Sequence, residues 1–173
     1  RAQADRQGVL ERSRLGDEDA MTQVLEEALS AIDWLRETEV SFEFGDGGHA
    51  AYLDVDLPEI EDMPTEEATP AARGLRLNIR ARSEAQRQRE YARHVHAVAF
   101  RTIGTVFARL PSIQSVVFSG YSQRPDRATG RVVDEYLLGA TVARAHWAQI
   151  DFSNLAQLDV IAAFDRFTTR RKM

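Results

Sequence analysis

The hydrophobic and polar positions of the chain follow a helical period most clearly over residues 83–110. Ser83 with Gln86 three residues later matches a capping box, in which the serine hydroxyl accepts a free backbone N–H at the start of a helix. Pro111 ends the pattern, because the residue before a proline disfavours helical geometry. The stripe between these signals is mostly apolar at three- and four-residue steps: Tyr91, Ala92, Val95, Val98, Ala99, Thr102, Ile103, Val106, Phe107 and Leu110. We therefore predict one long central helix whose apolar face packs on a sheet.

Shorter patterns before this helix predict one further helix and three strands. Residues 17–36 begin with three acids and carry an apolar stripe, as in an amphipathic helix. Residues 40–44 and 51–57 alternate between apolar and polar side chains and are separated by a glycine-rich turn, which predicts a hairpin. Residues 58–72 are acidic and rich in proline and are predicted as an exposed loop, and residues 74–80 alternate again as a third strand.

Two more strands and a helix are predicted after the long helix. Residues 112–123 and 132–144 are apolar on both faces around their centres, which is typical of interior strands. A hairpin is the simplest way to pair them. A terminal helix is predicted from Ser153 or Asn154, either of which is a good cap, to Phe167.

The predicted order α-β-β-β-α-β-β-α gives an α+β (mixed α/β) fold, arranged as a two-layer domain with the long central helix packed on a five-stranded sheet. Residues 17–173 form a single α+β domain in this interpretation. Residues 1–16 are charged and weakly apolar, and we assign them no fold. They are expected to be a lead-in that belongs to an upstream region.

Composition narrows the class of protein. The 173 residues fit one domain, and 43% hydrophobic with 28% charged residues is ordinary for a globular protein. The chain has no cysteine, which excludes disulfides, a thiolate nucleophile and a cysteine-based zinc site. No apolar run approaches the roughly 20 residues of a transmembrane helix, and the start lacks a signal-peptide pattern. A soluble cytoplasmic protein without membrane contact is therefore expected.

Charge is strongly segregated along the chain, although the net charge is only −5. Residues 17–67 hold 17 acidic residues against one basic residue, Arg36, a net charge of −16. Residues 73–131 hold 12 arginines against three acids, a net charge of +9. Opposite blocks attract each other, either within one chain or between two copies. We therefore expect salt-sensitive self-association, most simply a dimer, with internal compensation of charge as the alternative.

Asp54 and Asp56 are the most suggestive candidates for chemistry. Their spacing of two residues on a strand places both carboxylates on one face, about 7 Å apart. A hard cation such as Mg²⁺ or Mn²⁺ could bind there. The favoured interpretation is structural: if the second and third predicted strands are neighbours, the aspartates lie across from Arg76 and Arg80 as a ladder of opposite charges.

With this pair, the predicted order α-β-β-β-α-β resembles the core of the restriction-endonuclease-like PD-(D/E)xK nucleases over about residues 19–121. The resemblance implies a metal-dependent nuclease whose site would combine Asp54 or Asp56 with Asn78 and Arg80. The family has an acid and a lysine at the last two positions, where this sequence has an asparagine and an arginine.

Two histidines of the long helix are separated by a single residue. His94 and His96 therefore point about 200° apart around the helix axis and cannot ligate one ion together. His96 falls beside Phe100 and Ile103 near the apolar stripe. We expect it to be a buried, hydrogen-bonded core histidine and not a catalytic base.

Two groups of polar residues are candidates for binding. The segment around the long helix is rich in arginine, including Arg76, Arg80 and Arg87, and could contact nucleic acid, although internal charge compensation is favoured. The ends of the C-terminal hairpin should bring together polar and aromatic side chains that could bind a partner or ligand: Tyr121, Ser122, Gln123, Arg124, Asp134, Glu135 and Tyr136.

The sequence contains none of the standard catalytic motifs. The expected function is that of a non-catalytic α+β module of a larger bacterial protein, acting through protein contacts or self-association without a cofactor. The bacterial source is inferred from the abundance of alanine and of arginine, which supplies 21 of the 22 basic residues. The alternative is a divergent metal-dependent nuclease or nucleic-acid-binding domain of restriction-endonuclease-like topology, with Mg²⁺ or Mn²⁺ at Asp54 and Asp56.

Overall fold

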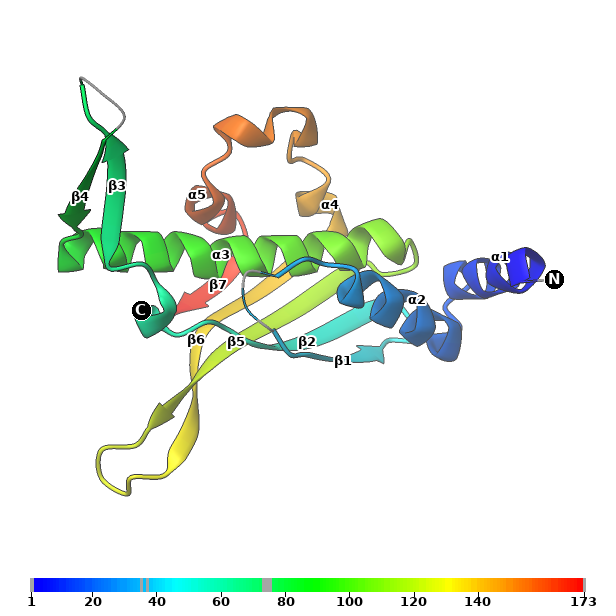
Figure 1. Cartoon of the computed structure of the whole chain (residues 1–173). Coiled ribbons are helices and arrows are strands. Elements are labelled where there is room, and N and C mark those ends of the chain that lie inside the picture. The colour runs from blue at the N-terminus through cyan, green and yellow to red at the C-terminus, as the bar shows by residue number, and fades with distance from the viewer. Residues whose placement is uncertain (1, 35, 37, 73–75, 173) are drawn as a thin grey trace.

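The computed structural model describes residues 2–34, 36, 38–72 and 76–172, and it confirms the α+β class. A mixed sheet of five strands carries a 26-residue helix, α3 (Glu84–Arg109), across one face (Figure 1). The strands are, in their order across the sheet, β1 (Val40–Gly45), β2 (Ala50–Asp56), β5 (Ser115–Pro125), β6 (Val132–Ala143) and β7 (Thr168–Arg171).

The connections of this sheet follow from its strand directions. β1 and β2 form an antiparallel hairpin. β2 and β5 run parallel, so the chain between them crosses over the sheet through α3. β5 pairs antiparallel with β6, and β6 pairs antiparallel with β7, which forms the edge opposite β1. The predicted hairpin between the two C-terminal interior strands is thus confirmed.

The start of α3 and its buried face agree with the sequence signals. The Ser83 hydroxyl accepts a hydrogen bond from the backbone N–H of Gln86 at 3.2 Å. The Gln86 side chain does not return to the cap, as a full capping box requires, but donates to Glu67 and Glu90 at 3.0 and 3.3 Å. The predicted stripe is buried at every position except Ala92, which is half-buried: Tyr91, Val95, Val98, Ala99, Thr102, Ile103, Val106, Phe107 and Leu110.

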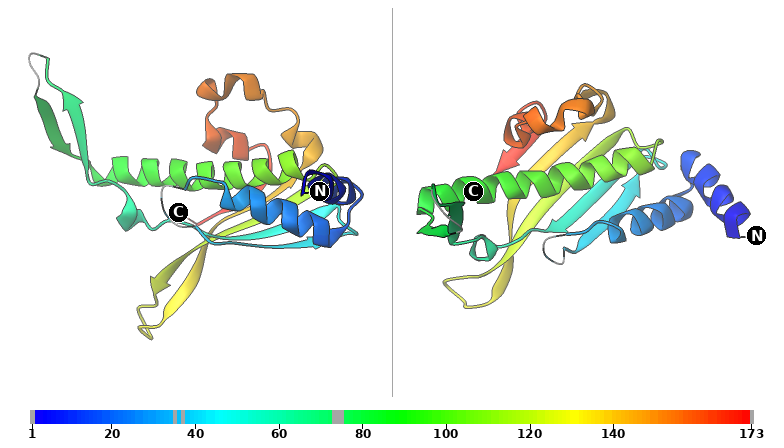
Figure 2. Two further views of the ribbon diagram at one scale, coloured as in Figure 1. Left: turned by 45° about the vertical axis from the view of Figure 1, so that its right-hand side comes forward. Right: turned by 45° about the horizontal axis from the view of Figure 1, so that its top comes forward.

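Helices cover one face of the five-stranded sheet (Figure 2). α2 (Glu18–Ser30) packs beside α3 and buries Leu25, and α5 (Val160–Phe164) also packs on α3 and buries Phe164. The sheet faces them with apolar side chains such as Val55, and together these residues form one core. This arrangement confirms the predicted two layers. No helix within the described residues combines the length and the hydropathy that a membrane span needs.

The strand predicted at residues 74–80 forms as β4 (Leu77–Ala81), while residues 74 and 75 lie outside the described part of the chain. The prediction that this strand joins the main sheet is wrong. β4 pairs antiparallel with β3 (Glu66–Pro70) in a separate sheet. β3 lies in the segment that was predicted as a loop. Alternation of side chains defines the faces of a strand and not its partner, and a nearby partner has the lower loop-closure cost. The fifth strand of the main sheet is β7 instead.

The terminal helix predicted over residues 153–167 is wrong. After α4 (Arg144–Trp147) the chain forms a 3₁₀ helix, η2 (Phe152–Gln157), then α5 and β7. Asp159 explains the break, because its carboxylate accepts bonds from the backbone N–H groups of Ile161 and the next residue and so begins α5 as a new helix. The β-branched residues at the start of β7 favour a strand.

The N-terminal segment, to which the sequence assigns no fold, forms the helix α1 (Ala2–Arg14). α1 packs against α2, and Arg6 pairs with Glu27 across the two helices at 2.6 Å. Its apolar side chains Val9 and Leu10 reach the edge of the core. Such a narrow stripe gives little periodic signal, which is why the sequence pattern did not predict this helix.

His96 is the buried, hydrogen-bonded histidine that the sequence predicts, with 1% of its surface exposed. Its Nδ1–H donates to the Ala92 carbonyl at 2.6 Å, and its Nε2 accepts from the Nε–H of Arg171 at 2.9 Å. One neutral tautomer satisfies both contacts. Burial is the main cause that lowers the pKa of His96, and the charge of Arg171 lowers it further, whereas the Ala92 carbonyl, Asp165 and Asp159 act in the opposite direction.

The buried face of α3 predicts a large cost for shortening Ile103, which is fully buried. Ile103→Ala should lower the free energy of unfolding by about 2–4 kcal/mol, because it removes apolar contacts and leaves a cavity. Arg93→Ala, at an exposed position of the same helix, should change it by less than about 0.5 kcal/mol. Urea denaturation would measure both variants, and equal midpoints would show that the helix face is wrongly assigned.

The buried imidazole predicts that stability falls as the pH is lowered from about 7.5 to about 5.5. Because the pKa of His96 is lower in the folded chain than its ordinary value of 6.5, the unfolded chain takes up the proton first. The loss is about 1.4 kcal/mol for each pH unit over which only the unfolded chain is protonated. Urea titrations should show a flatter pH dependence for His96→Gln than for His146→Gln, since the His146 side chain is exposed. An unchanged slope in His96→Gln would contradict this assignment.

Candidate functional site

The face of the main sheet that carries no helices presents polar and aromatic side chains. On β2, Leu53 and Val55 are buried in the core, so Tyr52, Asp54 and Asp56 point to the opposite face. We call this surface the open face. The sequence correctly predicts that both aspartates share one face of a strand.

The register of the sheet places further side chains beside the two aspartates. Asp54 lies opposite Ser119 of β5, and Asp56 lies opposite Tyr121. Tyr121 lies in turn opposite Tyr136 of β6, with 5.8 Å between the two ring centroids. Across the strands, Asp54 is therefore next to the hydroxyl of Ser119, and Asp56 is in one row with the phenols of Tyr121 and Tyr136.

Each aspartate has a partner that the sequence did not predict. Arg36 Nη2 donates to Asp56 Oδ2 at 2.9 Å, and the Tyr136 hydroxyl donates to Asp54 Oδ2 at 3.3 Å. The second oxygen of each carboxylate, Oδ1, is buried and has no hydrogen-bond partner among the described residues. Half of the acceptor capacity of this pair is thus left for other groups.

Arg76, Asn78 and Arg80 do not meet the aspartates. Asn78 and Arg80 lie on β4, and Arg76 directly precedes it, all exposed. The predicted ladder with Asp54 and Asp56 is wrong, because the neighbours of β2 are β1 and β5. For the same reason the residues that the nuclease resemblance implies lie on two separate sheets. Within the described ranges, no group of three or more histidine, aspartate or glutamate side chains is arranged to hold a metal ion.

The surroundings of the open face make it less favourable for its acidic side chains to carry a negative charge. Burial raises the pKa of Asp54, and the nearby charge of Asp134 raises it further, whereas the bond from Tyr136 lowers it. Burial also raises the pKa of Tyr121, and the charges of Asp56 and Asp54 add to the effect. Such a surface favours a cation or a hydrogen-bond donor from a partner.

β5 and β6 continue past the sheet as a two-stranded arm, residues 121–136 (Figure 1). Their register shifts between Gly120 and Tyr121, and a bulge of this kind bends and twists the strands. At the tip, Asp126 Oδ1 accepts the backbone N–H groups of Ala128 and the next residue and so closes the turn. The residues predicted to gather at a hairpin end do come together, but at the base of the arm.

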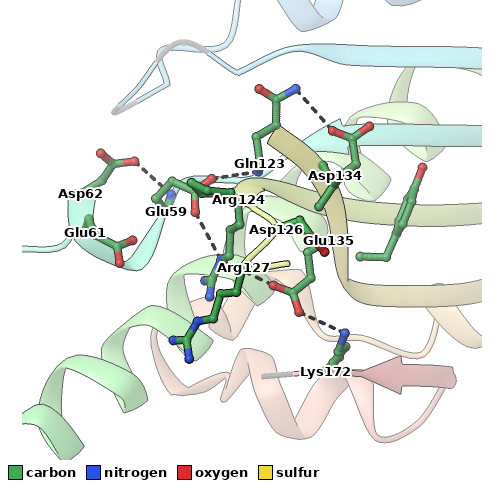
Figure 3. A pocket seen from close by; sticks show the side chains of 13 residues that line it. Glu59, Glu61, Asp62, Gln123, Arg124, Asp126, Arg127, Asp134, Glu135 and Lys172 are labelled. Atoms are coloured by element: carbon green, nitrogen blue, oxygen red, sulfur yellow. Dashed lines mark hydrogen bonds and ion pairs between the residues drawn. The ribbon is translucent and has the colours of Figure 1, made fainter. Parts of the chain in front are cut away.

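A cleft of about 990 Å³ lies where the arm leaves the body (Figure 3). Its walls are the arm, the segment that contains the 3₁₀ helix η1 (Ile60–Asp62), and Lys172 after β7. Six acidic and three basic side chains line it, so its net charge is negative. Five of the residues that the sequence predicts for binding line this cleft: Gln123, Arg124, Asp134, Glu135 and Tyr136.

Ion pairs fasten the base of the arm to the body. Glu59 Oε1 accepts the backbone N–H of Gln123 at 2.9 Å, and its Oε2 lies 3.6 Å from Arg124 Nε. Arg124 also lies 3.6 Å from Glu135 Oε2, and Glu135 Oε1 lies 3.0 Å from Lys172 Nζ. The Lys172 ammonium lowers the pKa of Glu135. Three segments that are distant in sequence are thus joined at the cleft.

Arg87, predicted as a binding residue, fastens η1 to α3. Its Nη2 donates to the Ile60 carbonyl at 3.2 Å, and its Nη1 lies 3.5 Å from Glu84. Sequence reasoning missed Arg36 and Glu59, because their contacts span 20 residues to Asp56 and 64 residues to Gln123, where no periodicity applies. The one available signal was that Arg36 is the only basic residue within an acidic block.

The contacts of Glu59 predict that its removal loosens the arm. Glu59→Ala should lower the free energy of unfolding by about 1–3 kcal/mol, because it leaves the Gln123 N–H and the Arg124 guanidinium without this acceptor. Hydrogen exchange across residues 121–136 should become faster. The control is Glu61→Ala, an exposed acid of the same cleft with no ion pair among the described residues. Equal exchange in both variants would refute this role of Glu59.

Carboxylates, phenols and a few paired cations meet at this end of the molecule, and these groups suit non-covalent recognition of a polar or cationic partner. Comparison of the chain with protein-family models, with curated proteins and with solved structures finds no match. The function is therefore argued from the geometry of this chain.

Proposed function

We propose that this domain is a non-catalytic interaction module of a larger bacterial protein, and that it acts through protein contacts, first of all with a second copy of itself. The observation that carries this proposal is the β3–β4 hairpin, which presents an apolar surface outside the core. The simplest resulting species is a dimer.

The hairpin has an apolar face that no described part of the chain covers. Its register places Ala68 opposite Ile79 and Pro70 opposite Leu77, so these four side chains share one face. Leu77 is 64% exposed and Ile79 is 68% exposed. A sheet of two strands is only marginally stable in water, so a partner that covers this face would stabilise both the hairpin and the complex.

The hairpin is nevertheless anchored at its base. The backbone N–H of Arg82 donates to the Thr65 carbonyl at 2.9 Å, and the Arg82 side chain pairs with Glu90 of α3. Gln86 of α3 donates to Glu67 of β3 at 3.0 Å. These contacts hold the hairpin at the first turns of α3, where it projects away from the main sheet (Figure 2). An anchored, exposed apolar surface is typical of a protein-contact site.

Charge supports a second copy as the partner. β3 carries Glu66 and Glu67, whereas β4 carries Arg80 and follows Arg76. The hairpin therefore has an acidic and a basic strand, as the whole chain has an acidic and a basic block. Two copies of such a surface can meet with opposite charges facing each other, which steers their encounter.

The alternative, a nuclease or nucleic-acid-binding domain, has less support. The residues that it would combine lie on two sheets. Two arginines of the basic segment already have protein partners, because Arg82 pairs with Glu90 and Arg87 donates to the Ile60 carbonyl. We find no contact among the described residues that favours this alternative over self-association.

Size-exclusion chromatography with light scattering should detect a concentration-dependent dimer at low salt. At about 1 M salt the species should shift toward the monomer, because the Debye length falls from about 8 Å at physiological ionic strength to about 3 Å. The double variant Leu77→Ser with Ile79→Ser should raise the dissociation constant roughly tenfold or more, because it removes apolar area from the contact.

The matched control is Leu155→Ser, which removes an apolar side chain that is 49% exposed on η2, outside the hairpin. This variant should associate like the original chain. A monomer at every concentration and every salt level would rule out self-association. A dimer that resists high salt would show that apolar burial, and not charge, holds the contact.

A further inference from the structure

We infer that the contact between two copies is a shared sheet, in which β4 of one copy adds to the outer edge of β1 of the other. This inference rests on the proposed self-association, and it names the surfaces that form the contact. It follows from three properties of the two strands: a free side on each, a matching pattern of side chains, and opposite charge.

β1 is an edge strand with an unprotected outer side. It is first in the strand order of the main sheet, so β2 pairs with one side and no strand of the described chain pairs with the other. Its six residues contain no proline, no lysine and no bulge, which are devices that block pairing at sheet edges. Phe42 and Phe44 are only partly buried in the core, with 5.5 Å between their ring centroids. Ser41 and Glu43 alternate with them and are exposed.

β4 is a strand of similar length that also has a free side. β3 pairs with one side, and all five residues of β4 are exposed. Leu77 and Ile79 point to one face of the hairpin, and Asn78 and Arg80 point to the other. β4 thus offers backbone groups and an apolar row that the described chain leaves uncovered.

The side-chain patterns of the two strands match. Both alternate with a period of two, and each has one apolar and one polar row. When β4 of a second copy pairs with β1, its apolar row continues the core-facing surface beside Phe42 and Phe44. Arg80 then lies on the open face, on the same side as Glu43. The added strand is joined by backbone hydrogen bonds, as in other cases of strand addition to a free edge.

Charge selects this pairing over the other edges. Two β1 strands facing each other would bring Glu43 of each copy together. With its Ala68 and Pro70 row beside the phenylalanines, β3 on β1 would place Glu67 on the same face as Glu43. β7 carries Arg170, which would complement Glu43, but its sequence Thr-Thr-Arg-Arg has no apolar row to cover the phenylalanines. β4 on β1 joins opposite charges and two apolar rows, and neither strand contains a proline, whereas β3 contains Pro70.

The pairing would extend the main sheet from five strands to seven, because β3 follows β4. β4, which the sequence pattern places in the main sheet, would then join the main sheet of a second copy and not that of its own chain. The contact joins two different strands, so around a two-fold axis it occurs twice: β4 of each copy meets β1 of the other, and the two contacts together form one isologous interface that closes a dimer.

The test reverses one charge on each strand. Glu43→Arg alone places arginines on both facing strands, and Arg80→Glu alone places glutamates on both, so each variant should raise the dissociation constant of its own dimer by roughly tenfold. An equimolar mixture of the two variants should associate like the original chain, because one contact is then native and the other has both charges exchanged. Light scattering of the separate variants and of the mixture measures this directly.

Arg93→Glu, a charge reversal at an exposed position of α3, is the control and should leave association unchanged. If Arg80→Glu only disrupted the hairpin, the mixture would not recover, and that result would overturn the inference. Unchanged association of both single variants would overturn it as well, while leaving self-association intact. If the original chain is a monomer under all conditions, the proposed function fails together with this contact.

Discussion

The packing of α3 on one face of the sheet is the contact from which the rest of the structure follows. α3 is about 39 Å long at 1.5 Å per residue, and its buried residues run from Tyr91 to Phe107. The turns before Tyr91 carry the β3–β4 hairpin through Gln86 and Glu90. The buried stretch begins at Tyr91, whereas the helix begins at Glu84, so the hairpin attached to these first turns stands outside the core. The same one-sided cover by helices leaves the opposite face of the sheet free for Asp54 and Asp56.

The periodicity of apolar residues in the sequence predicted those features of the fold that depend on which side of a helix or strand is buried. The stripe of α3, the burial of His96 and the β5–β6 hairpin all follow from periodicity, because burial acts on each position separately. The partner of β4 could not be predicted, since its alternation would be the same in either sheet. The contact of Arg36 with Asp56 was not predictable either, because it depends on how an irregular segment folds back over 20 residues. At the candidate site, the sequence identified the arm residues but not the body residues that face them.

Part of the segregated charge is paired within the described chain, and part of it is not. Glu59 of the acidic block pairs with Arg124 of the basic block at the cleft, and Arg36 pairs with two aspartates inside the acidic block. These pairs confirm that part of the charge is compensated within the chain. Glu43 and Arg80, in contrast, take part in no ion pair among the described residues. The unused charges lie on strands with a free side, which is where a second molecule can reach them.

β7 has only four residues, and among its contacts are its pairing with β6 and the bond from Arg171 Nε to His96 Nε2. Arg171 and His96 are 75 positions apart in the sequence, so this contact closes a long loop and is expected to form late in folding. The hydrogen bonding of His96 Nε2 therefore depends on whether β7 has docked. In a chain enriched in ¹⁵N, the resonance of His96 Nε2 would report whether the domain is complete, without any dye or spin label.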